Sequence, residues 1–385
     1  MDYDRMRKIL YISGTRADYG LIQSTLRNIN SHPGMILEMI VTGMHLMEEF
    51  GTTINEIRKD GLKYHTIEST YKKDEKGSMV EFIGVFLQKL SLKIKEINPD
   101  IILVLGDRGE MLAGAIAGVY LGIPVAHIHG GEVSSTVDDL TRHAITKLAH
   151  IHFPATKLSA KRIIKMGEPE ETVFVVGAPG LDSILSEKLM EPEKIADLYG
   201  LDLSRPTVVV IQHPVSMEIE HAKDQIRQTL DAVVDLKFQT VVVYPNADAG
   251  GREMIEVIKH YENNPNITVY KNIPRKEYLS LLKVANVLVG NSSSGIIEAS
   301  SFRLPVVNIG TRQKGRERGE NVIDANYEKN DIKSKILRCL YDEIFWQKVK
   351  NFNNPYGDGK AGDRITEVLD NISINEKLLQ KSLSY

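Results

Sequence analysis

The chain has a single cysteine, Cys339, among 385 residues. It therefore cannot form an internal disulfide or a zinc site with several thiolate ligands, and a reducing compartment is expected. Long apolar runs are missing as well: none approaches the about 18 residues that a membrane span needs, and the run near the N-terminus is too short for a signal peptide. We expect a cytoplasmic protein that does not associate with membranes.

An excess of charge of one sign is also absent, since 48 Lys and Arg face 51 Asp and Glu, a formal net charge of -3. This balance argues against nucleic acid as a partner, so any anion site must be local. The contents of 42% hydrophobic and 26% charged residues are typical of a folded globular protein. Because single cores stop growing at roughly 250–300 residues, the length predicts two domains.

Short apolar runs alternate with stretches of helical periodicity, the pattern of βα units on a buried parallel sheet. The expected strands are residues 8–13, 37–41, 101–105, 125–128, 151–153 and 173–176, then 207–212, 239–244, 267–270, 287–289 and 306–309. The predicted fold class is α/β, with two Rossmann-like domains at 1–190 and 205–355.

A charged segment with two prolines, residues 187–206, predicts a short helix and linker between the domains. The last helical segment, about 363–385, is expected to pack back on the first domain. Ligands of such sheets bind at the carboxyl ends of the strands, so the sequence predicts a site in a cleft between the two domains.

The first two strand-end loops carry arginines and a carboxylate. Gly14-Thr-Arg-Ala-Asp-Tyr-Gly20 opens a helix and is expected to offer free backbone N–H groups and Arg16 to a phosphate. It matches neither a Walker loop nor G-x-G-x-x-G, which argues against an ATPase or a nicotinamide enzyme. Asp107 and Arg108 follow the strand at 101–105. The alternatives are a plain turn with Arg16 exposed and a helix-capping Asp107.

The third loop has the highest density of polar groups, with His127, His129, Glu132, Asp138, Asp139, Arg142 and His143 within a short span. His127 and His129 are two residues apart and would point to the same face of the strand, where they could both bind a metal. No third ligand stands at a recognisable spacing, so no metal is expected. Glu132 and Asp138 are candidates for a paired acid and base, because crowded carboxylates have pKa values that are pushed apart. The alternative is that both are ordinary surface charges.

The second half repeats polar strand ends at Gln212-His213-Pro214 and Tyr244-Pro-Asn246. Gly290-Asn-Ser-Ser-Ser-Gly-Ile-Ile-Glu298 begins a helix with hydroxyls and N–H groups, an anion cradle without lysine, and Glu298 is placed to accept ribose hydroxyls. Four basic residues lie between Arg312 and Arg318 in a glycine-broken loop suited to phosphate. Helix capping by the serines and a solvated basic loop are the alternatives.

Taken together, these motifs resemble those of the hydrolysing UDP-N-acetylglucosamine 2-epimerases, which form N-acetylmannosamine and UDP for sialic acid synthesis. The motifs that carry the resemblance are Gly14-Thr-Arg-Ala-Asp-Tyr, Gly106-Asp-Arg, His129-Gly-Gly-Glu, Asp138-Asp139 with Arg142-His143, Gln212-His-Pro, Pro245-Asn-Ala-Asp-Ala-Gly, Gly290-Asn-Ser-Ser and Gly310-Thr-Arg-Gln. The resemblance implies the glycosyltransferase-B fold, UDP-N-acetylglucosamine as substrate, no cofactor, and a homodimer or homotetramer.

It also implies roles for individual residues. Arg16, Arg108, His213, Asn246, Ser292, Ser293, Glu298 and Arg312 would bind UDP and the sugar, and Asp107, Glu132, Asp138, Arg142 and His143 would act in catalysis. Some members have His-Ile-Glu-Gly-Gly where this chain has His129 in place of the glutamate, so Glu132 would carry the acid/base work, alone or with His129.

The implied mechanism is loss of UDP from C1 and of the C2 proton, which gives a 2-acetamidoglucal, followed by addition of water with inversion at C2. Alternatives are the same chemistry on a UDP-diacetamido-trideoxy hexose or a GDP sugar, and a non-hydrolysing epimerase, whose members usually begin Gly-Thr-Arg-Pro-Glu. A glycosyltransferase and a non-catalytic nucleotide-sugar sensor complete the alternatives.

Overall fold

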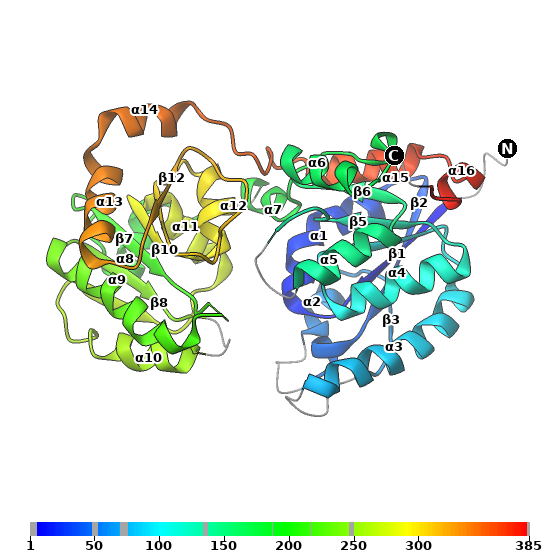
Figure 1. Ribbon diagram of the computed structural model, residues 1–385, viewed down its shortest axis with the longest axis horizontal. Coiled ribbons are helices and arrows are strands. Elements are labelled where there is room, and N and C mark those ends of the chain that lie inside the picture. Colours follow the sequence, from blue (N-terminus) through cyan, green and yellow to red (C-terminus); the bar gives the residue numbers. More distant parts are fainter. Residues whose placement is uncertain are drawn as a thin grey trace. The chain divides into compact units, whose positions relative to one another are not determined.

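A computed structural model of the chain describes residues 6–47, 53–69, 76–133, 138–186, 188–215, 217–245 and 250–382 (Figure 1). The described residues form two compact units, one from residues up to 133, 138–183 and 356–382 and one from residues 184–355. Each unit contains a six-stranded parallel sheet with flanking helices. The predicted α/β fold class with two Rossmann-like domains is confirmed.

The sheet of the first unit has the order β3-β2-β1-β4-β5-β6. Its strands are β1 (Arg7–Ser13), β2 (Met35–Val41), β3 (Tyr64–Thr66), β4 (Ile101–Leu105), β5 (Val125–Ile128) and β6 (Ile151–Phe153). Its helices are α1 (Arg16–Ser31), α2 (Ile54–Lys59), α3 (Lys76–Ile97), α4 (Gly109–Leu121), α5 (Asp138–Leu148), α6 (Lys157–Lys165), α15 (Ala361–Asn371) and α16 (Glu376–Leu379). Helix α7 (Gly180–Ser186) runs from this unit into the next.

Strand β1 is buried on both faces because helices cover both sides of the sheet. Ile9 and Tyr11 belong to the core under α1 and α15, whereas Leu10 and Ile12 belong to the core under α3 and α4. Alternate residues of a strand point to opposite faces, so a strand between two helical layers is apolar throughout. The carboxylate of Asp182 accepts hydrogen bonds from the first two amides of α15, at 3.0 and 2.6 Å, and ties this helix to the first unit.

The second unit repeats the plan with the order β12-β11-β10-β7-β8-β9. Its strands are β7 (Thr207–Ile211), β8 (Gln239–Val243), β9 (Ile267–Tyr270), β10 (Val287–Gly290), β11 (Val306–Ile309) and β12 (Val322–Ala325). Its helices are α8 (Pro192–Tyr199), α9 (Ala222–Leu236), α10 (Gly251–Lys259), α11 (Arg275–Val284), α12 (Ser293–Ser301), α13 (Lys329–Tyr341) and α14 (Glu343–Asn351).

Some local expectations were wrong. Residues 173–176 form only an isolated bridge between Val173 and His152. The edge strands β3 and β12 were not expected, because their short sequences YHT and VIDA contain no apolar run. The segment expected as one C-terminal helix forms two, since Asn375 caps a new helix by accepting a hydrogen bond from the amide of Leu378. Among the described residues, no helix is both long and apolar enough to span a membrane.

Candidate active site

The loop between β1 and α1 is closed by Asp18. The Oδ2 atom of this buried carboxylate accepts hydrogen bonds from the backbone N–H groups of Gly14 and Thr15, at 3.1 and 2.7 Å. Two of the loop amides that the sequence suggested for a phosphate, those of Gly14 and Thr15, are therefore already used by Asp18. Arg16 is exposed and pairs with Glu56 of α2 at 2.9 Å.

A buried polar network continues from this loop toward β2 and α4. Ser13 Oγ donates to Asp18 at 2.5 Å and lies 2.9 Å from Nε2 of His45, a histidine whose pKa is lowered to about 4 by burial. Glu110 is fully buried beside it, and a Cβ atom on Gly14 would stand 2.4 Å from Glu110 Oε1. A side chain at position 14 would therefore force the Glu110 carboxylate to move.

Arg142 of α5 connects the second and third loops. Its guanidinium donates Nη2–H to the carboxylate of Asp107, and Nη1 lies 3.1 Å from Oδ1 of Asp139 and 3.2 Å from the backbone oxygen of Glu132. The side chain is almost completely buried. One arginine therefore sets the positions of two carboxylates and of the loop that carries Glu132.

His129 and Glu132 form a pair at the carboxyl end of β5. His129 Nδ1 lies 2.5 Å from Glu132 Oε1, and both side chains are largely buried. The backbone of His129 has φ +62°, in the left-handed region that non-glycine residues seldom adopt. The structure thus places His129 beside the predicted acid/base residue.

The neighbouring histidines have other roles. His127 Nε2 lies 2.8 Å from the backbone oxygen of Gly106, which makes it a hydrogen-bonded core residue. Burial lowers the pKa of His143, which lies one residue beyond Arg142 on α5. No cluster of three or more metal-ligating side chains occurs among the described residues. The side chain of the predicted Asp138 lies outside the described part of the chain.

In the second unit, the buried side chain of Asn291 organises the ends of β7 and β10. Its Oδ1 accepts from His213 N at 2.7 Å and its Nδ2 donates to His213 O at 2.9 Å. Its backbone oxygen accepts from Arg312 at 3.1 Å and from Gln313 at 2.8 Å. Asn291 therefore brings the predicted His213 and Arg312 to one point, although no role was predicted for Asn291 itself.

The N-terminus of α12 carries the predicted hydroxyls. Ser292 caps the helix by accepting from Ser294 N at 3.3 Å, and Ser293 is its first residue. Ser294 donates to the carboxylate of Glu298, which also lies 3.8 Å from Arg275. Glu298 is hence held in place one turn into the helix. The predicted Asn246 lies outside the described residues.

The structure brings together Asp107, Glu132 and Arg142 in the first unit, and His213 with Arg312 in the second. Sequence reasoning assigned no role to Asp139, whose three-residue spacing from Arg142 on a helix was the available signal. It also missed His45 and Glu110, because nothing in the local sequence indicates that Glu110 lies against Gly14.

Known proteins resemble this chain over nearly its whole length. A 2-epimerase of Legionella pneumophila named UDP-N,N'-diacetylbacillosamine 2-epimerase (hydrolyzing) is 42% identical over 381 residues, covering 99% of this chain and 100% of the relative. A UDP-N-acetylglucosamine 2-epimerase of Neisseria meningitidis is 35% identical over 369 residues, covering 95% and 96%.

A solved structure and a family profile point to the same family as these relatives. The crystal structure of UDP-GlcNAc 2-epimerase from Neisseria meningitidis bound to UDP-GlcNAc superposes with a TM-score of 0.80 at 18% identity, covering 94% of this chain and 99% of that one. The profile of the family described as UDP-N-acetylglucosamine 2-epimerase matches residues 27–370. The chain belongs to the UDP-N-acetylglucosamine 2-epimerase family.

Proposed function

We propose that the protein is a hydrolysing 2-epimerase whose substrate is UDP-N,N'-diacetylbacillosamine, a UDP-linked diacetamido-trideoxy hexose. The observation that carries this choice is the 42% identity, over the full length, to the Legionella pneumophila enzyme named for that substrate. UDP-N-acetylglucosamine, the substrate expected from the sequence, becomes the second candidate and has the support of the Neisseria meningitidis relative at 35%.

The reaction is the same for either sugar, because both carry an acetamido group at C2. A base takes the proton from C2 while the C1–O bond to UDP breaks, and the electron pair of that bond leaves with the diphosphate. Water then adds to the resulting C1=C2 double bond. The hydroxyl adds to C1, and a proton adds to C2 on the face opposite to the one from which the first proton was removed. The products are UDP and the free sugar with C2 inverted.

In this proposal the first unit performs the proton transfers. Glu132, paired with His129, and Asp138 are the acid/base groups, while Arg142 positions the carboxylates of Asp107 and Asp139. Carboxylates close to the sugar stabilise the positive charge that develops as UDP leaves. The neutral form of His143 is favoured by its lowered pKa, so it would offer a hydrogen bond to the sugar without adding a positive charge.

The second unit takes the UDP. The N-terminus of α12 with Ser292 and Ser293 supplies N–H groups and hydroxyls to the diphosphate, and a helix N-terminus favours negative charge. Glu298 would accept the ribose hydroxyls, and the remaining proposed contacts are those of His213, Asn246 and Arg312 in this unit and of Arg16 and Arg108, which belong to the first unit. The arginines would neutralise the leaving diphosphate.

The test is to incubate the purified protein in deuterated water with each UDP-sugar separately and to follow the products by proton NMR. We expect free sugar with deuterium at C2 and one equivalent of UDP, with kcat/KM at least about tenfold higher for the diacetamido sugar. A UDP-linked epimer as product would contradict hydrolysis, and turnover of UDP-N-acetylglucosamine alone would favour the second candidate. An arm with EDTA tests the expectation that no metal is needed.

The variant that tests the role of Glu132 is Glu132→Gln, which keeps the size of the side chain and removes the base. A loss of less than about tenfold in kcat would argue against Glu132 as a proton-transfer group, since such groups contribute about 100-fold or more.

The expected homo-oligomer stays a prediction, which light scattering on the purified protein would check.

A further inference from the structure

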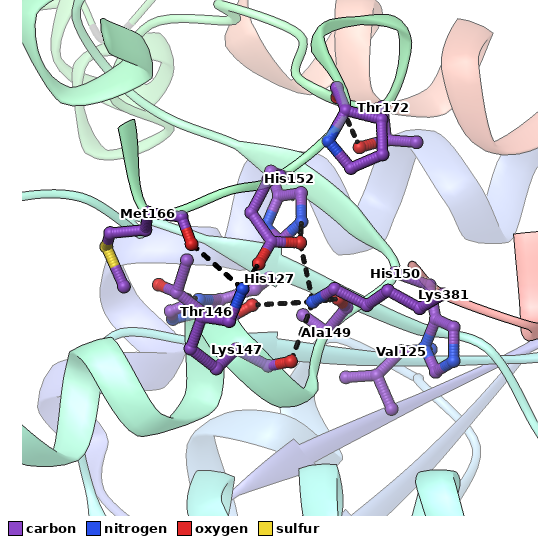
Figure 2. Close-up of polar contacts among 12 residues, drawn as sticks. Val125, His127, Thr146, Lys147, Ala149, His150, His152, Met166, Thr172 and Lys381 are labelled. Atoms are coloured by element: carbon purple, nitrogen blue, oxygen red, sulfur yellow. Dashed lines mark hydrogen bonds and ion pairs between the residues drawn. The ribbon is translucent and has the colours of Figure 1, made fainter. Parts of the chain in front are cut away.

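A buried ion cluster lies at the end of α5 opposite to the candidate catalytic residues. At its centre is the carboxylate of Glu168, which is completely buried. The Nζ atoms of Lys147 and Lys381 each lie 2.5 Å from it, and His152 Nε2 lies 3.1 Å away (Figure 2). None of these four side chains takes part in the proposed chemistry.

Lys381 comes from the C-terminal segment that follows α16. Its ammonium donates to three backbone oxygens at the C-terminal end of α5: Ala149 at 2.6 Å, Lys147 at 2.7 Å and Thr146 at 3.3 Å, as Figure 2 shows. The last carbonyls of a helix have no partner within the helix and carry partial negative charge. Lys381 therefore caps α5 from a segment more than 200 residues away along the chain.

In the cluster one carboxylate faces two ammonium groups. Burial alone would raise the pKa of Glu168, but hydrogen bonds from His152, Lys147 and Lys381 lower it to about 2, so the carboxylate is ionised at neutral pH. Burial lowers the pKa of Lys381, and the contact with Glu168 opposes that shift. Glu168 thereby keeps the ammonium charged where it meets the carbonyls of α5.

Helix α5 links this cluster to the candidate active site. Arg142 lies on its second turn, and the helix rises about 1.5 Å per residue, so the capped end is only about 10 Å beyond Arg142. A second route leads to the Asp107 loop: Thr146 Oγ1 lies 3.3 Å from His127 Nδ1, and His127 Nε2 lies 2.8 Å from the oxygen of Gly106. Helix α5, which carries Arg142, ends at the cluster, and the Asp107 loop is connected to the last turn of α5 through His127 and Thr146.

We propose that Lys381 is a positioning residue for the reaction, acting by fixing α5 and through it Arg142. This inference rests on the proposed function. Stability alone does not account for the arrangement, because a buried ion pair contributes little net stability compared with apolar packing. A fixed orientation of a helix that carries the reacting groups, in contrast, acts directly on rate, since a misplacement of about 1 Å can cost about 100-fold.

The experiment compares Lys381→Met with the matched variant Lys377→Met in the full-length protein. Lys377 lies on α16 of the same segment, but it is exposed and pairs with the exposed Glu171 at 3.1 Å. We expect Lys381→Met to lower kcat about tenfold or more with KM changed less than about twofold, and Lys381→Arg to restore most of the rate. Lys377→Met should behave as the wild type.

Hydrogen exchange of the α5 amides gives a second measurement that does not depend on activity. Faster exchange in Lys381→Met, and not in Lys377→Met, is expected. Wild-type kcat and wild-type exchange in Lys381→Met would overturn the proposal, and so would a lowered melting temperature with unchanged kcat per folded molecule. If the wild type turned over no UDP-sugar, the proposed function would fail, while the exchange data would still decide whether Lys381 holds α5.

Discussion

His129 Nδ1 and Glu132 Oε1 lie 2.5 Å apart, and His129 reaches this distance with a left-handed backbone, φ +62°. Such a conformation costs a non-glycine residue about 1 kcal/mol or more and is found preferentially at functional sites. The turn after β5 thus holds an imidazole against the carboxylate that we propose as a proton-transfer group.

His129→Asn removes the imidazole but keeps the backbone conformation, because asparagine adopts the left-handed region readily. We expect a melting temperature close to that of the wild type and a kcat lowered about tenfold or more, since acid/base pairs contribute on that scale. Lys237→Asn is the control, because Lys237 also has a left-handed backbone, φ 55°, at the end of α9. Wild-type kcat in His129→Asn would exclude a role for the imidazole.

Arg142→Lys keeps the positive charge but removes the planar fork that contacts Asp107 and Asp139 together. We expect kcat to fall about 100-fold while the protein stays folded, because a single ammonium cannot orient both carboxylates. Steady-state kinetics and circular dichroism measure the two effects. Arg338→Lys, which alters an exposed ion pair with Asp342 on α13, should change kcat less than about twofold; an equal loss in both variants would contradict the prediction.

Glu298→Gln tests the proposed ribose contact. Calorimetry should show UDP binding weakened about tenfold, since a carboxylate accepts two hydroxyl hydrogen bonds more strongly than an amide. Binding of 2'-deoxy-UDP, which lacks one of those hydroxyls, should change much less. The control is Glu262→Gln, at the exposed carboxylate that accepts from Tyr244 at 3.2 Å. Equal losses for the two nucleotides would place the ribose elsewhere.

The buried histidines predict a protein that loses stability in mild acid. Burial lowers the pKa of His127 to about 3 and that of His150 to about 4. Unfolded histidines titrate near about 6.5, so below that pH the unfolded chain binds more protons, and the free energy of unfolding falls as the pH drops toward the folded pKa values. Glu168, with a pKa of about 2, adds a further loss below its ordinary value of 4.5.

Urea unfolding at pH 7.5, 6 and 5 measures this slope, to which each histidine adds up to about 1.4 kcal/mol per pH unit. His150→Asn should flatten it, because an amide oxygen can accept the hydrogen bond that Val125 N donates to His150 Nδ1 at 3.2 Å without taking up a proton. An unchanged slope in His150→Asn would show that His150 does not contribute.

Local pattern was sufficient to predict most strands, because a strand covered by helices on both faces must be apolar along its length. It missed β3 and β12, since an edge strand needs no such run. It also predicted a strand at residues 173–176, because an apolar run can be buried without pairing along its length, and this segment forms only one bridge. The order of the strands in each sheet depends on how the connecting helices cross the sheet, which the hydrophobic periodicity of the sequence does not show.

The sequence by itself determined the α/β class, the two-domain plan and the strand-end motifs that carry Asp107, Glu132, His213 and Glu298. These features follow from short-range periodicity and from the polar residues that end parallel strands. Only the tertiary structure decided that Glu110 lies against Gly14, that Arg142 reaches Asp107, and that Lys381 returns to cap α5. The physical reason is that contacts between residues far apart in the chain depend on how helices pack on the sheet, which no local spacing specifies.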